Sequence, residues 1–140
     1  MTKPITTFEY NEMVRLLGMS PAKAKNWTVG RPFKIEASMH TATGQGSRNL
    51  YSLDDVHLMG IANELSKAGM AAKAIGKLIE AVKTGFPNGL SAVDTLYISR
   101  GPKLAYRIET REDRLPKDDV VRITINIGEL RGRIKKAGTK

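Results

Sequence analysis

The spacing of apolar residues changes near residue 90, and this change constrains the fold more than any other feature. Up to about residue 83, outside the segment 31–51, apolar residues recur every three or four positions, as on one buried face of a helix. From residue 96 they alternate with polar residues, as in a strand with one buried face. The stretch between, TGFPNGLSAV, is typical of a linker. The sequence therefore predicts an α+β chain with a helical domain at 1–84, a linker at 85–93 and a β-rich region at 94–140.

The composition excludes several classes of protein. None of the 140 residues is cysteine, which excludes a disulfide framework and a thiolate metal site. The first residues lack the apolar core of a signal peptide, and no stretch approaches the roughly 18 apolar residues of a membrane helix. We therefore expect a cytoplasmic protein with no membrane association, no cofactor and no metal.

The net charge of +9 is the strongest indication of a partner. Residues 1–51 carry seven Lys or Arg against three acids, whereas residues 52–90 are neutral. A basic N-terminal third suits a polyanion, first of all nucleic acid. Solubility alone is the competing interpretation of this charge.

Two helices separated by a short turn are predicted near the N-terminus. Apolar spacing predicts a helix over about 8–17, which Gly18 ends. Ser20 is a suitable N-cap for a second helix over 21–28, with Pro21 at its first position. Two helices joined by such a turn form a helix-turn-helix, whose second helix lies in the DNA major groove. A plain helical hairpin with a solvated basic face is the alternative.

The second helix carries residue types that contact DNA. Lys23 and Lys25 are suited to phosphate or guanine, and Asn26 is suited to adenine. The alternation that follows, in 33–37, predicts a strand, and Arg48–Tyr51 is predicted as the returning strand of a β-hairpin. A hairpin at this place would be a wing. An ordinary flexible connector is the competing interpretation.

The rest of the chain is predicted as a second helix pair followed by strands. Ser52 is expected to cap a third helix, and Gly69 to separate it from a fourth. Three strands and a short helix over about 128–136 then hold too little core to stand alone. We expect the isoleucine-rich face of the last strand to pack on a second copy of the chain. An intramolecular α+β fold is the alternative.

Three stretches resemble the N-terminal domain of the MerR family of bacterial transcription regulators. They are SPAKAKNW, RNLYS and LSKAGMAAKAIGKLI. In the first, Lys25 stands where the family has arginine, and Trp27 stands at its second aromatic position. The resemblance covers a little over half the chain and implies a winged helix-turn-helix of about four helices. It further implies a bacterial, nucleoid-associated regulator that binds an inverted repeat of double-stranded DNA as a homodimer.

The resemblance also implies which residues contact DNA. These residues are Ser20, Lys23, Lys25, Asn26, Trp27, Arg31, Lys34, Arg48 and Tyr51. For Trp27 and Tyr51, packing in the core is an equally good interpretation. The family continues into a long dimerisation helix, whereas this chain turns to strands, so no effector site can be carried over and a small-molecule effector remains unknown.

Other classes fit less well or remain as alternatives. The histidines, His40 and His57, stand in no catalytic pattern, and GQGSRN lacks the Lys-Ser/Thr of a phosphate loop. We therefore expect no enzyme. An architectural DNA binder of the excisionase type and an antitoxin-like DNA-binding protein with a protein partner are the alternatives to a regulator.

Overall fold

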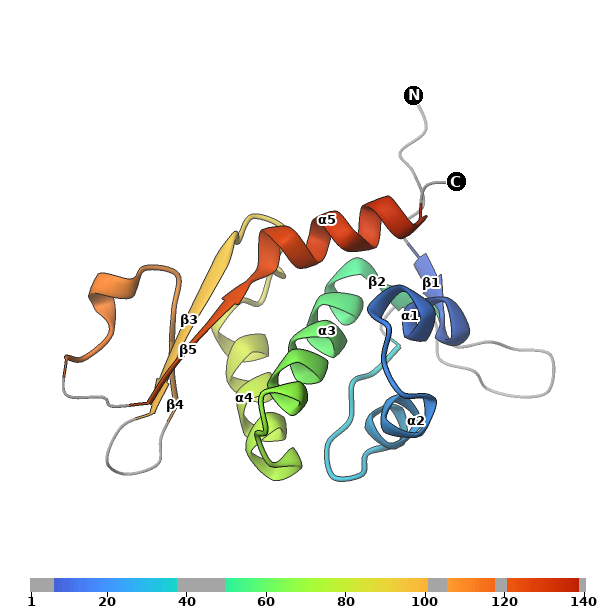
Figure 1. Cartoon of the computed structure of the whole chain (residues 1–140), viewed down its shortest axis with the longest axis horizontal. Helices are drawn as coiled ribbons and strands as arrows, with labels where there is room; N and C mark the ends of the chain where they lie inside the picture. Colours follow the sequence, from blue (N-terminus) through green and yellow to red (C-terminus); the bar gives the residue numbers. More distant parts are fainter. Residues whose placement is uncertain (1–6, 38–49, 101–105, 118–120, 139–140) are drawn as a thin grey trace. The chain divides into compact units, whose positions relative to one another are not determined.

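The computed structural model describes residues 7–37, 50–100, 106–117 and 121–138 (Figure 1). These residues form five α-helices, a short 3-10 helix and two small antiparallel sheets, which confirms the α+β class. The chain divides into two compact units, Met1–Gly76 and Lys77–Lys140. The division falls inside the fourth helix, whereas the sequence places the boundary after that helix.

The first unit is mainly helical. Its elements are β1 (Thr7–Glu9), α1 (Tyr10–Leu17), α2 (Pro21–Val29), β2 (Leu50–Ser52), α3 (Leu53–Lys67) and the beginning of α4 (Ala72–Gly85). Gly18, Ser20 and Ser52 cap their helices as expected, but α1 begins at Tyr10 and not at about residue 8, because Thr7–Glu9 form β1. Gly18 ends α1 in the left-handed conformation at φ 60°, and Ser52 forms a capping box with Asp55 at the start of α3.

The predicted hairpin over 33–51 differs from the structure. Residues 33–37 have no regular secondary structure, and β2 pairs with β1, with Phe8 opposite Tyr51. The alternation in this segment has another cause, because Ile35 donates its backbone N–H to the Trp27 carbonyl at 2.8 Å and buries its side chain. The remainder of the predicted wing, 38–49, lies outside the described residues.

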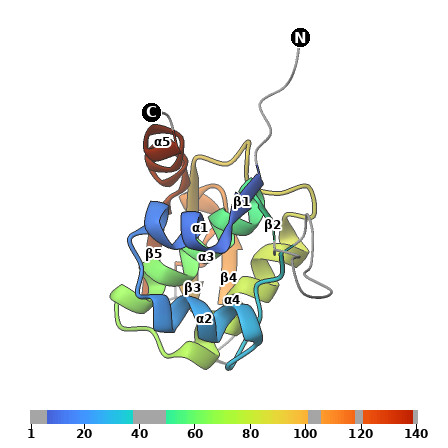
Figure 2. The same ribbon diagram turned by 90° about the vertical axis from the view of Figure 1, so that its right-hand side faces the viewer.

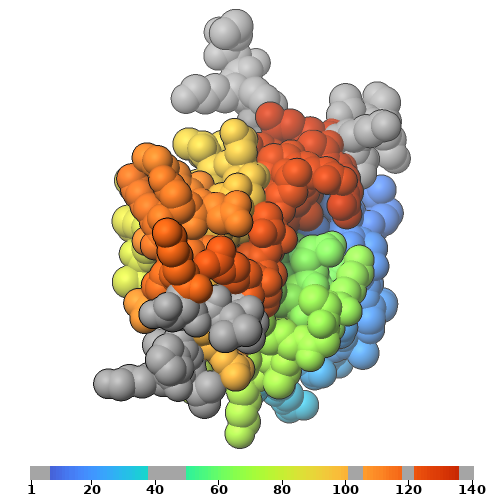
Figure 3. Space-filling model, turned by 60° about the vertical axis from the view of Figure 1, so that its left-hand side comes forward, coloured from blue at the N-terminus to red at the C-terminus, as the bar shows by residue number. Residues whose placement is uncertain are grey.

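The second unit is a three-stranded sheet with helices. It contains the rest of α4, then β3 (Thr95–Arg100), β4 (Tyr106–Glu109), the 3-10 helix η1 (Glu112–Arg114), β5 (Val121–Asn126) and α5 (Ile127–Gly138). The strand order is β4-β3-β5, and all pairs are antiparallel. In this order β3 separates β4 from β5. Figure 3 shows the segment that follows β4, in orange, beside the orange-red atoms of β5, and Glu112 of η1 pairs there with Arg122 of β5 at 3.9 Å.

Most of the apolar face of this sheet is already buried in the single chain. Leu96, Ile98 and Ile125 expose between 0 and 6% of their surface, as does Ile127 at the start of α5, whereas Ile123 is half-buried. The intramolecular alternative therefore accounts for the burial of these side chains, and the homodimer stays a prediction.

Arg131 on α5 holds the segment before β3 in place. Its Nη2 donates to the carbonyl oxygens of Leu90 and Val93, both at 2.6 Å. The Gly128 N–H donates to the Asp94 carbonyl at 2.9 Å. The segment predicted as a linker, 85–93, is therefore joined to α5 by hydrogen bonds.

Candidate nucleic-acid interface

Helix α2 has one face in the core and one face in solvent. Ala24 and Trp27 are 0 and 3% exposed, and they anchor the helix in the first unit. The opposite face presents Ala22, Lys25, Asn26 and Val29, all of which are exposed. These four positions follow the i, i+3, i+4, i+7 spacing of one helix face. We call them the exposed face of α2.

The turn before α2 fixes how the helix begins. The Ser20 side chain accepts a hydrogen bond from the Lys23 backbone N–H at 3.4 Å, which caps the helix. The Tyr10 hydroxyl donates to the Pro21 carbonyl at 3.0 Å and ties the start of α2 to α1. Figure 2 shows the two helices as neighbours in the first unit. The exposed face of α2 is thus carried on a helix with a defined start.

The buried face of α2 is held by aromatic packing. The Trp27 and Phe33 rings stack with centroids 5.1 Å apart and 28° between their planes. Phe33 in turn lies against Gly76, where a Cβ would come within 2.9 Å of the Phe33 Cβ. Trp27 is therefore a core residue, which favours the packing interpretation over a phosphate contact.

Lys23 points its charge at a neighbouring helix. Its Nζ donates to the Ser66 Oγ on α3 at 2.7 Å and lies 5.8 Å from the centre of the Trp27 ring. The side chain is half-buried, unlike that of Lys25. In this arrangement Lys23 positions α2, and its ammonium group is not on the exposed face.

The remaining predicted contacts fall in three groups. Arg31 and Lys34 are exposed just after the end of α2. Tyr51 on β2 is 1% exposed, so its side chain belongs to the core. Arg48 lies outside the described residues. The residues predicted as one set of DNA contacts therefore occupy three different places in the structure: the exposed face of α2, the segment after it and the core.

Val29 and Ala22 complete a face of which the sequence pattern predicts only Lys25 and Asn26 as DNA contacts. Val29 is 55% exposed, unusually high for a large apolar side chain in the described part of the chain. The sequence predicts that the second helix ends at residue 28, which leaves Val29 outside it. In the structure Val29 is the last residue of α2 and lies seven residues after Ala22 on the same face.

Helix α2 and most of the segment after it carry positive charge, and the exposed Glu36 is the first carboxylate that follows. From Ser20 to Ile35 the chain holds four cationic side chains and no carboxylate. The cations are Lys23, Lys25, Arg31 and Lys34. Such a cluster of cationic side chains attracts anions.

Two other kinds of site are not supported by the described residues. Among them, no group of three His, Asp or Glu side chains could hold a metal ion. His57 is fully buried on α3, with its Nδ1 3.9 Å from the Asp54 Oδ1, and His40 lies outside the described ranges. None of the described helices is long and apolar enough to cross a membrane.

Compared with models of known protein families and with curated protein sequences, the chain matches none.

Proposed function

We propose that this chain is a sequence-specific DNA-binding transcription regulator that uses α1 and α2 as a helix-turn-helix. One observation carries the proposal. A capped helix exposes a lysine, an asparagine and a valine on one face, while its other face is packed in the core. A face of this kind, free of carboxylates, suits insertion into a groove lined with phosphates.

Each residue of the exposed face has a suitable partner on DNA. The Asn26 amide can bond an adenine in the major groove through two hydrogen bonds. Lys25 can meet a phosphate or a guanine, and Val29 and Ala22 can contact the methyl group of thymine. Arg31 and Lys34 then add phosphate contacts after the helix, which fix position without reading sequence.

The proposal retains the wing and the MerR-like character of the first unit. In it, Arg48 contacts a phosphate of the DNA backbone from the wing, as the likeness to that family implies. Lys23 and Trp27 contribute indirectly, because their contacts with Ser66 and Phe33 fix the orientation of α2. The supporting observation is the likeness of SPAKAKNW, RNLYS and LSKAGMAAKAIGKLI to that family.

The proposal also retains a homodimer on an inverted repeat, because a single short helix reads few base pairs and such regulators read two half-sites. Leu96, Ile98 and Ile125 on the isoleucine-rich face of the sheet are buried in the single chain, whereas Ile123 is half-buried. We therefore propose that the two copies join through residues 94–140 mainly outside the buried part of this face. That burial also favours the second candidate function, an architectural DNA binder that acts without this dimer contact.

Fluorescence anisotropy with the full chain and labelled duplex DNA tests the proposal. The K25Q/N26A double variant alters only exposed side chains and should lose at least about tenfold in affinity. The control is K83Q, a lysine on α4 that is also exposed and pairs with Glu80 at 3.8 Å. Equal losses in both variants would contradict the assignment of the exposed face of α2.

A further inference from the structure

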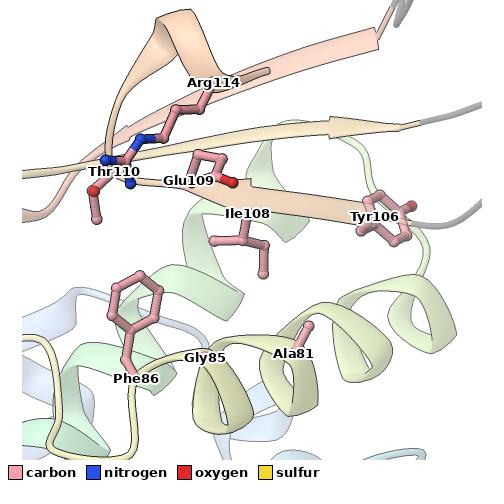
Figure 4. A pocket seen from close by; sticks show the side chains of 8 residues that line it. All are labelled: Ala81, Gly85, Phe86, Tyr106, Ile108, Glu109, Thr110 and Arg114. Carbon is pink, nitrogen blue, oxygen red and sulfur yellow. The ribbon is translucent and has the colours of Figure 1, made fainter. Parts of the chain in front are cut away.

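A pocket of about 350 Å³ lies in the second unit, far along the chain from α2 (Figure 4). Its lining residues are Ala81, Gly85, Phe86, Tyr106, Ile108, Glu109, Thr110 and Arg114. The proposed DNA-binding function uses none of them. The volume is near the lower end of the ~300–1,000 Å³ typical of ligand pockets, so a ligand would be small.

The part of α4 that lines the pocket has almost no side-chain volume. Ala81 and Gly85 are four residues apart and therefore lie on the same face of the helix. A Cβ at Gly85 would find no atom within 4 Å. The space between helix and strand is consequently left open.

The walls of the pocket are apolar and partly aromatic. Phe86, Tyr106 and Ile108 are all half-buried and line the space beside Ala81. Tyr106 and Ile108 are two positions apart on β4, so they face the same side of the sheet. Two aromatic rings in a space of this size suit a flat apolar body that can stack on one of them.

One end of the pocket carries an available positive charge. Figure 4 shows the Arg114 guanidinium beside Thr110, at the end where Phe86 lies. The two acids that precede Arg114 in η1 are paired elsewhere, Asp113 with Arg111 at 2.8 Å and Glu112 with Arg122 at 3.9 Å. Arg114 itself has no ion pair with any residue that the structure describes. Its charge is therefore free to meet an anion.

We propose that this pocket binds a small monocarboxylate with an aromatic or branched apolar body. The guanidinium presents two parallel N–H donors that match a carboxylate, and the Thr110 hydroxyl can donate a further hydrogen bond. The apolar body lies against Phe86 and Ile108. Glu109 also lines the pocket, and its negative charge disfavours a ligand that carries more than one negative charge, such as a dicarboxylate or a phosphate.

Two probes with the same aromatic body but opposite charge test the proposal on the full chain. They are phenylacetate and phenethylamine, each followed by protein-observed NMR. Phenylacetate should shift the amide signals of the lining residues and bind at least tenfold more tightly than phenethylamine. Equal binding of the two, or no binding of phenylacetate, would overturn the proposal.

Two variants separate the pocket from general attraction to a basic protein. R114Q should weaken phenylacetate at least tenfold, whereas R133Q, an arginine on α5 that is 60% exposed, should leave its binding unchanged. G85L should fill the pocket and abolish binding, with its fold checked by circular dichroism. If G85L does not fold, R114Q against R133Q decides the matter, and equal losses in those two would overturn the proposal.

Discussion

The Lys23 Nζ lies 2.7 Å from the Ser66 Oγ, a hydrogen bond that joins α2 to α3. Two residues further on, Lys25 lies on the exposed face of the same helix. Two lysines that look equivalent in the sequence thus occupy different environments. One is fixed against a neighbouring helix and the other is open to solvent, so their loss should have different consequences.

Replacing Lys23 should reduce stability more than it changes the electrostatics of DNA binding. K23M keeps the length of the side chain but removes the hydrogen bond to Ser66, which should cost about 1 kcal/mol in the free energy of unfolding. Thermal unfolding followed by circular dichroism measures this change. The slope of log K against log salt for DNA should stay close to the wild-type value. A slope reduced as far as that of a Lys25 variant would place Lys23 at a phosphate.

Replacing Lys25 should have the opposite pattern. K25Q removes an exposed charge, so the melting temperature should remain within the error of the measurement. If Lys25 meets a phosphate, the slope of log K against log salt becomes shallower by about 1 per half-site. Anisotropy titrations at several salt concentrations give the slope. An unchanged slope would remove Lys25 from the phosphate contacts.

Val29 should read thymine through its methyl group. Once a preferred duplex is known, replacing thymine by deoxyuridine at the contacted position removes only that methyl. Wild-type affinity should fall about fourfold, as expected for the loss of one buried methyl contact. The V29A variant should bind both duplexes equally. If V29A discriminates between them as well as the wild type does, Val29 is not the contact.

Gly76 should tolerate no larger residue. In G76A the new Cβ would lie 2.9 Å from the Phe33 Cβ, and Phe33 cannot move freely because it stacks on Trp27. We expect a loss of about 1–3 kcal/mol in the free energy of unfolding, measured by urea denaturation. The matched control is G132A on α5, where a Cβ meets nothing within 4 Å and should stabilise the helix slightly. Equal stability of the two variants would contradict the close packing at Gly76.

The sequence predicts the helices well because their signals are local. Gly18, Ser20 and Ser52 act within one turn of their own helix, and the structure confirms each as a cap. The change of period near residue 90 likewise predicts the strands of the second unit. These features depend on neighbours in sequence and need no knowledge of the tertiary fold.

The errors arise where distant residues decide the outcome. The alternation at Phe33 and Ile35 predicts a strand, but both side chains pack irregularly against α2 and its surroundings. The partner of β2 is β1, whose three residues give too short a pattern to recognise. The different environments of Lys23 and Lys25 follow from the position of Ser66, 43 residues along the chain. No local pattern contains that information.

Selection of random duplex DNA by the purified full chain at physiological salt tests the central claim most directly. We predict enrichment of a defined sequence arranged as an inverted repeat, with adenine and thymine at contacted positions of each half-site. The N26A and V29A variants should then lose the preference for adenine and for thymine, respectively, at these positions. Retention of DNA without any enriched sequence, or no retention at all, would contradict a sequence-specific regulator.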